Sequence, residues 1–105
     1  MDRESQVFRA LADENRRVLL DLLLESDRSV GELSKQLTIS QPAVSQHLQI
    51  LREAGLVSHH KDGRQNIYSV DADPLLSVAG WLSKYEAFWD EKLDAFANLL
   101  KRKRN

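Results

Sequence analysis

Residues 41–53 present hydrogen-bonding side chains of low net charge on one face of a predicted helix. Val44, Leu48 and Leu51 recur at helical spacing and predict the buried face. The opposite face holds a polar set, which consists of Gln41, Pro42, Ser45, Gln46, Gln49, Arg52 and Glu53. Glutamine can pair with adenine through two hydrogen bonds, serine both donates and accepts, and arginine suits guanine or phosphate. This face predicts base recognition in a DNA major groove, although glutamine and serine are also ordinary surface residues.

A second polar group lies in a predicted hairpin. Asp62-Gly63 stands between two runs that can pair as strands, which is a strong hairpin signal. A two-residue turn there places Lys61 opposite Arg64 and Val57 opposite Tyr68. Basic side chains at a hairpin tip can hold the phosphate backbone while a neighbouring helix reads bases, and they are also common solubilising features.

Four predicted helices precede the hairpin, and short-range signals mark their ends. Asp13 is a predicted N-cap, and Ser29 with Glu32 matches a capping box. Ser40 is predicted to cap the fourth helix, and Gly55 to end it. The apolar residues that define the first three helices are Val7, Phe8 and Leu11; Val18, Leu19, Leu22 and Leu23; and Leu33 and Leu37.

Asp73-Pro74 predicts the start of one long helix over residues 74–104, about 46 Å in length. Its apolar residues form two stripes, whereas a helix that packs only on its own domain usually needs one. Two stripes indicate that the helix also packs against a second subunit. One alternative is a single wide buried face. Another alternative is that the aromatic residues line a pocket for an apolar effector. The predicted dimer interface consists of Val7, Phe8, Leu11, Leu82, Tyr85, Trp89, Leu93 and Phe96.

The composition indicates one small domain. With 105 residues and no cysteine, the chain excludes disulfides, thiolate metal sites and cysteine nucleophiles. The net charge is −1, but residues 28–70 carry five basic and three acidic groups, a net positive segment. We expect a cytoplasmic protein with no membrane partner, because no apolar run has the length of a membrane helix and the first residues lack a signal peptide.

Three stretches together resemble the ArsR/SmtB family of bacterial winged-helix repressors: ALADENRRVLLDLL, SVGELSKQLTISQPAVSQHLQILREAGLV and KDGRQNIYSV. The resemblance implies a homodimer that binds double-stranded DNA at an inverted repeat and represses transcription. It implies base contacts by Gln41, Pro42, Ser45 and Gln46, to which the helical wheel adds Gln49. Backbone and wing contacts are predicted for Ser40, Arg52, Lys61 and Arg64. Glu14 and Asn15 depart from the Pro-Thr pair that many members have before Arg16.

The positions at which many members of this family hold a metal carry unsuitable residues here. Glu32-Leu33-Ser34-Lys35-Gln36 stands in place of a cysteine-containing run, and Ala72, Pro74, Tyr85 and Phe88 stand in place of Asp and His ligands. His59 and His60 are adjacent on a strand, so they point to opposite faces. We predict no metal and no cofactor; an unfamiliar site of a histidine with Glu86 or Asp90 is the alternative.

These observations predict a mainly α fold with a small β-hairpin: a winged helix-turn-helix that is dimeric through its first and last helices. Residues 1–105 are one predicted DNA-binding domain, in which residues 74–104 are the dimerisation helix. The predicted function is sequence-specific transcriptional regulation by a homodimeric repressor, with no enzymatic activity and an unknown effector. The alternatives are a winged-helix module that binds proteins instead of DNA, and a repressor that senses a metal or small molecule at a non-standard site.

Overall fold

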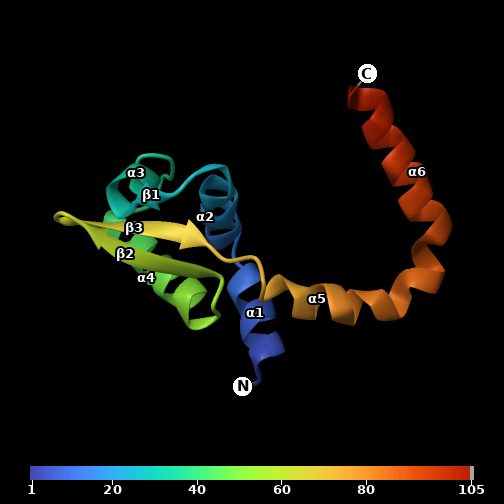
Figure 1. The fold of residues 1–105 in the computed structure, drawn as a ribbon, viewed down its shortest axis with the longest axis horizontal. Helices are drawn as coiled ribbons and strands as arrows, with labels where there is room; N and C mark the ends of the chain where they lie inside the picture. The colour runs from blue at the N-terminus through green and yellow to red at the C-terminus, as the bar shows by residue number, and fades with distance from the viewer. Residues whose placement is uncertain (105) are drawn as a thin grey trace.

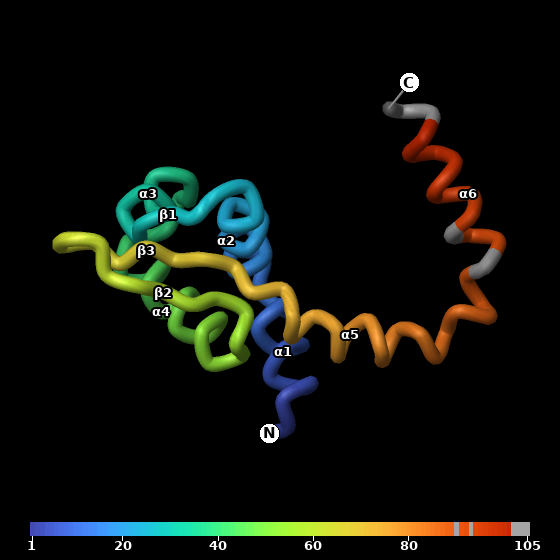
Figure 2. Tube along the Cα trace, in the orientation of Figure 1, coloured from blue at the N-terminus to red at the C-terminus, as the bar shows by residue number. Residues whose placement is uncertain are grey.

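The computed structural model describes the backbone of residues 1–104 and the side chains of residues 1–89, 91–92 and 94–101. In chain order the elements are α1 (Arg3–Leu11), α2 (Glu14–Glu25), β1 (Arg28–Ser29), α3 (Val30–Ser34), α4 (Gln41–Glu53), β2 (Val57–Asp62), β3 (Gln65–Val70), α5 (Leu75–Leu82), the 3-10 turn η1 (Ser83–Tyr85) and α6 (Glu86–Arg104). The segments α1 to β3 form one body, from which α5 and α6 extend (Figures 1 and 2). Among the described residues, no helix has the length and apolar character needed to cross a membrane.

The core is built around the inner face of α4. Val44, Leu48 and Leu51 are completely buried, as the helical spacing predicts. They belong to a cluster with buried residues of α1, α2, α3 and the hairpin, including Leu19 and Leu33. Complete burial of such a side chain contributes about 1.5–3 kcal/mol relative to exposure. Because the core holds one face of α4, the opposite face is directed to solvent.

The predicted helix ends are confirmed at four places. Asp13 accepts a hydrogen bond from the backbone N–H of Arg16 at 3.2 Å. Ser29 and Glu32 form the reciprocal capping box, and Ser40 accepts from the backbone N–H of Ala43 at 3.3 Å. At the end of α4, Gly55 has a φ of 77°. The N–H of Leu56 then bonds to the carbonyl of Leu51 and that of Gly55 to Arg52, which is the Schellman arrangement.

The third helix is shorter than predicted. It ends at Ser34, and Leu37 lies in the connector to α4, although it still packs against the core. The N–H groups of Gln36 and Leu37 bond three residues back, to Leu33 and Ser34, so the chain tightens into turns there.

The sheet has three antiparallel strands in the order β1-β3-β2. The predicted hairpin is present, but the pairing of β1 with β3 was not predicted, because two residues carry no visible strand pattern. Arg28 lies opposite Tyr68, and Ser29 lies opposite Ile67.

The predicted position of the hairpin turn is wrong by one residue. Asp62 pairs with Gln65, so Gly63 and Arg64 form the turn. Lys61 faces Asn66 instead of Arg64, and Val57 faces Val70 instead of Tyr68. The backbone explains the difference. Within the turn, Gly63 has a positive φ (64°) and Arg64 does not, and a turn with glycine at its first central position needs only that one positive φ.

The predicted single C-terminal helix is also wrong, because the chain turns at residues 83–85. α5 and α6 are separated by η1 and run in clearly different directions in Figure 1. The Ser83 hydroxyl donates to the carbonyl of Gly80 at 2.6 Å. Glycine and serine together are a common cause of helix kinks, and such a bond from serine to the preceding turn bends helices.

Candidate nucleic-acid interface

The exposed face of α4 carries all five residues predicted to read bases. Gln41, Pro42, Ser45, Gln46 and Gln49 are each exposed to solvent. They share one face because Val44, Leu48 and Leu51 anchor the other side of the helix in the core. The hydrogen-bonding groups of Gln41, Ser45 and Gln46 are therefore available to a partner outside the chain.

A cleft of about 350 Å³ joins this face to the wing. It is lined by Ser29, Val30, Gly31, Gln41, Ser45, Arg64, Gln65 and Asn66. Two of the predicted base-reading residues, Gln41 and Ser45, thus share one cleft with Arg64 of the hairpin turn. The structure thus brings Arg64 of the turn next to two residues of α4 that lie about twenty positions earlier in the sequence.

The predicted backbone-contacting residues occupy different settings. Lys61 and Arg64 are exposed on the wing. Ser40 is exposed too, but its hydroxyl already caps α4. Arg52 Nη1 donates to Gln49 Oε1 at 3.2 Å, and Gln49 Nε2 donates to Glu53 Oε1 at 3.3 Å. Both ends of the Gln49 amide are therefore used within α4, unlike the free side chain that the helical wheel suggests.

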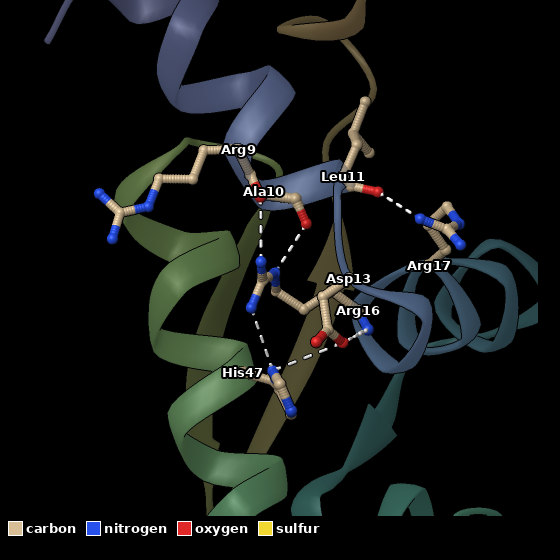
Figure 3. A network of polar contacts seen from close by, with 7 residues as sticks. All are labelled: Arg9, Ala10, Leu11, Asp13, Arg16, Arg17 and His47. Carbon is tan, nitrogen blue, oxygen red and sulfur yellow. Dashed lines mark hydrogen bonds and ion pairs between the residues drawn. The ribbon is translucent and has the colours of Figure 1, made fainter.

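Behind the exposed face, His47 takes part in a network that joins three helices (Figure 3). Its Nδ1 lies 3.3 Å from Nη1 of Arg16 on α2 and 3.9 Å from Oδ1 of Asp13. The His47 side chain is only 19% exposed, so this histidine packs between α4 and the start of α2. Burial alone would raise the pKa of Asp13, but the hydrogen bond from the backbone N–H of Arg16 and the positive charge of Arg16 hold the pKa below its usual value.

Sequence reasoning missed several residues of this region. Gln65 and Asn66 line the cleft immediately after the hairpin turn, and only the corrected register places them there. The sequence indicates Arg16 only as a position within the family resemblance, but its side chain contacts residues six and thirty-one positions away. No local pattern signals such a contact.

The predicted dimer residues divide into two groups. Val7 is completely buried in the chain's own core, so it is withdrawn from the interface, because it has no surface to offer a partner. Leu11 packs partly against the same core. Phe8, Leu82, Tyr85 and Phe96 are large and exposed, by 36%, 36%, 40% and 57%. Trp89 is half-buried. The side chain of Leu93 lies outside the described residues.

Aromatic rings connect α1 to the C-terminal segment. Phe8 meets Trp81 edge-on at 5.6 Å between centroids, and Trp81 meets Tyr85 at 5.3 Å. Tyr85 then stacks on Trp89 at 6.0 Å. Phe88, 76% exposed, lies beside Tyr85. The exposed rings form a continuous apolar strip over α1, α5, η1 and the start of α6.

Within the described side chains, no three His, Cys, Asp or Glu residues come close enough to hold a metal ion. His60 is exposed, whereas His59 is half-buried and lies against Tyr68 at 5.1 Å between ring centroids. The two neighbouring histidines therefore have separate surroundings. Glu86 is exposed at the start of α6, and the side chain of Asp90 lies outside the described residues.

Comparisons with known proteins agree with this geometry. The profile of the family described as "Bacterial regulatory protein, arsR family" matches residues 13–59. The transcriptional repressor SdpR of Bacillus subtilis is 35% identical over 81 residues, which are 77% of this chain and 90% of that protein. An HTH-type transcriptional regulator of Mycobacterium tuberculosis is 36% identical over 95 residues, covering 90% of this chain and 86% of that one.

The fold gives the same result. The solved structure of an ArsR-like transcriptional regulator from Rhodococcus sp. RHA1 superposes with a TM-score of 0.75 and 33% identity, over 95% of this chain and 92% of that one. The three-stranded sheet, the α3–α4 pair and the wing are therefore those of a winged helix-turn-helix. With relatives of this identity matched over most of both chains, the protein belongs to the arsR family of bacterial regulatory proteins and is a DNA-binding transcriptional regulator rather than an enzyme.

Proposed function

We propose that this protein is a cytoplasmic homodimeric repressor that binds an inverted repeat in double-stranded DNA. The observation that carries the proposal is the cleft shared by Gln41, Ser45 and Arg64. A helix lying in the major groove would present the first two residues to base edges, while the wing reaches the adjoining backbone.

The division of roles follows from side-chain chemistry. Gln41, Ser45 and Gln46 can donate and accept, so they suit base edges, and Pro42 adds an apolar contact at the start of the helix. Lys61 and Arg64 are donors only, which suits phosphate oxygens. Arg52 and Ser40 flank the reading face as further backbone contacts, and Gln49 contributes through the orientation of Arg52.

The homodimer is supported by the exposed aromatic strip. A lone soluble domain rarely leaves several large aromatic residues on one continuous surface. A second copy that covers Phe8, Leu82, Tyr85, Trp89 and Phe96, with Leu11 at the edge and Leu93 in the same segment, would remove them from water. Residues 1–105 then act as one winged-helix domain whose segment 74–104 dimerises. A two-fold dimer would set two α4 helices about one DNA turn, roughly 34–36 Å, apart.

Repression is inferred from SdpR, which is named as a transcriptional repressor. Bound across a promoter, a dimer of this kind would block access by polymerase. No effector is assigned. A metal or small molecule that acts at a non-standard site is the alternative form of this proposal.

Selection from random duplex DNA with the purified, metal-stripped chain at about 150 mM salt tests the proposal, since salt strongly affects such affinities. We expect enrichment of an inverted repeat whose half-sites lie near one helical turn apart. Enrichment of a single half-site would contradict the dimer. Weak binding without any enriched sequence would favour the protein-interaction module. Transcription from a promoter that carries the selected site, with and without the protein, then tests repression.

A further inference from the structure

We propose that Arg16 and His47 are a positioning pair that holds the recognition helix α4 at one fixed orientation against α1. In the dimer, this orientation sets the separation of the two reading faces, and hence the spacer between half-sites that the protein accepts. The inference rests on the proposed function, because only a dimer on an inverted repeat has such a spacer. Neither residue is assigned a contact with DNA.

The Arg16 guanidinium joins two helices through one rigid group (Figure 3). On one side, its Nε donates to the Ala10 carbonyl at 2.7 Å and its Nη2 donates to the Arg9 carbonyl at 3.0 Å. Both carbonyls belong to the last turn of α1. On the other side, Nη1 meets Nδ1 of His47, in the middle of α4, at 3.3 Å. Because a guanidinium is planar and its donors are fixed, these contacts constrain one another.

The donor and acceptor roles in this pair are determined by arginine chemistry. Arginine stays protonated and can only donate. A hydrogen bond between the two side chains therefore requires Nδ1 of His47 to be the acceptor, with the ring proton on Nε2. The charged groups around the ring are Arg16 and Asp13, whose Oδ1 lies 3.9 Å from the same nitrogen.

Apolar packing fixes which face of α4 is buried, and a directional hydrogen bond can set the rotation of the helix more finely. The buried residues Val44, Leu48 and Leu51 hold the helix in the core, but apolar contacts have little directional preference. A hydrogen bond weakens steeply when its angle departs from linear. His47 lies directly after Ser45 and Gln46 in the sequence, so a rotation that breaks its bond to Arg16 also moves those two side chains.

The α1 residues that Arg16 binds lie next to the proposed dimer surface. Arg9 and Ala10 directly follow Phe8, the α1 residue that packs against Trp81 of α5. The route from the apolar strip to α4 therefore runs through α1 and the Arg16 side chain. This route gives Arg16 a role in geometry beyond its contribution to stability.

Arg17 provides a matched control. Its Nη1 donates to the Leu11 carbonyl at 2.7 Å, so it also binds the end of α1 and carries the same charge. In the described part of the chain, the Arg17 side chain forms this one hydrogen bond to α1 and none with α4. Arg17→Met therefore removes an arginine contact to α1 and leaves the connection to α4 in place.

The experiment measures the affinity of the full chain for a series of duplexes in which two identical selected half-sites are separated by spacers that differ by one base pair. The variants are Arg16→Met, His47→Leu, His47→Asn and Arg17→Met, and thermal unfolding of each is recorded. His47→Leu keeps a side chain of similar bulk without an acceptor. His47→Asn restores an acceptor close to the position of Nδ1.

We expect Arg16→Met and His47→Leu to reduce the preference for the best spacer over its neighbours by about tenfold, the loss expected for one charge-assisted hydrogen bond. His47→Asn and Arg17→Met should keep the parent's preference. Equal loss of affinity at every spacer would show a purely structural role and overturn the inference, as would failure of His47→Asn to restore the preference lost in His47→Leu. If Arg16→Met does not fold, the two His47 variants decide the result. A parent with no preferred spacer would instead contradict the inverted-repeat proposal.

Discussion

Arg52 donates a hydrogen bond to the side-chain oxygen of Gln49 at 3.2 Å, three residues back on the exposed face of α4. The nitrogen of the same amide donates to Glu53. Gln49 therefore orients its neighbours, whereas the side chain of Gln46, one turn nearer the start of the helix, is exposed and forms no hydrogen bond within the described part of the chain.

We therefore expect the two glutamines to contribute differently to the affinity for DNA. Gln46→Ala should weaken binding to the selected site by about 1–3 kcal/mol and relax the base preference at one position. Gln49→Ala should cost less, because its amide is already engaged within the helix. Dissociation constants measured at one salt concentration provide the comparison, and a larger loss for Gln49→Ala would reverse the assignment.

Arg64 lies in the hairpin turn and faces the cleft, where a phosphate is its expected partner. Arg64→Met should weaken binding to all sequences alike and lower the slope of log affinity against log salt by about 1. Lys84→Met, which removes an exposed cation from η1, is the control and should leave the slope unchanged. A sequence-dependent loss for Arg64→Met would indicate a base contact instead.

Phe96 is 57% exposed on α6 and belongs to the proposed dimer surface. Phe96→Ser should weaken dimerisation by about 2 kcal/mol or more, because it replaces a large apolar side chain of the proposed interface with a small polar one. Sedimentation over a range of concentrations measures this change. Leu24→Ser removes a side chain that is 73% exposed on α2, outside the proposed surface, and should have no effect. Identical behaviour of both variants would place the interface elsewhere.

Gly55 combines a φ of 77° with a close neighbour. A Cβ there would lie 3.0 Å from Nη2 of Arg3 and 3.5 Å from Cγ of Pro74. Gly55→Ala should lower the free energy of unfolding by about 1–2 kcal/mol, chiefly through the left-handed backbone, since the end of the Arg3 side chain can move. Gly80→Ala, with nothing within 4 Å, should be neutral or raise it by up to about 1 kcal/mol. Denaturant titration of both variants makes the comparison.

Glu32 connects stability to pH. The backbone N–H of Ser29, and then its hydroxyl, hold the pKa of Glu32 below its ordinary value of 4.5. A lowered folded-state pKa means that the capping box contributes its full stability above about pH 4.5 and loses it as the pH falls through the lower, folded value. Unfolding free energies should therefore decline less in acid for Glu32→Gln than for the parent. If the unfolding free energies of the parent and of Glu32→Gln declined equally with falling pH, Glu32 would not contribute to the acid sensitivity.

Short-range signals predicted most of the recognition unit. The caps at Asp13, Ser29 and Ser40, the Schellman end at Gly55 and the buried stripe of α4 each depend on residues within about one turn of one another. The exposed reading face followed directly, because a helix with one buried side has only one free side.

Features that depend on distant residues were missed or misplaced. β1 exists only through its pairing with β3 some forty residues later. The hairpin register depends on which backbone position adopts positive φ, and Asp62-Gly63 matches two registers equally well in sequence. Val7 and Phe8 are adjacent apolar residues, but only the packing of α1 reveals that the first is core and the second is surface.

Ser29 belongs to two structures at once. It is the last residue of β1, opposite Ile67 of the wing, and it is also the N-cap of α3. The wing is therefore structurally coupled to the first helix of the helix-turn-helix. Exchanging the hairpin for that of a relative would also disturb the start of the helix-turn-helix, so a chimera designed to alter specificity should transplant residues 28–70 as one cassette.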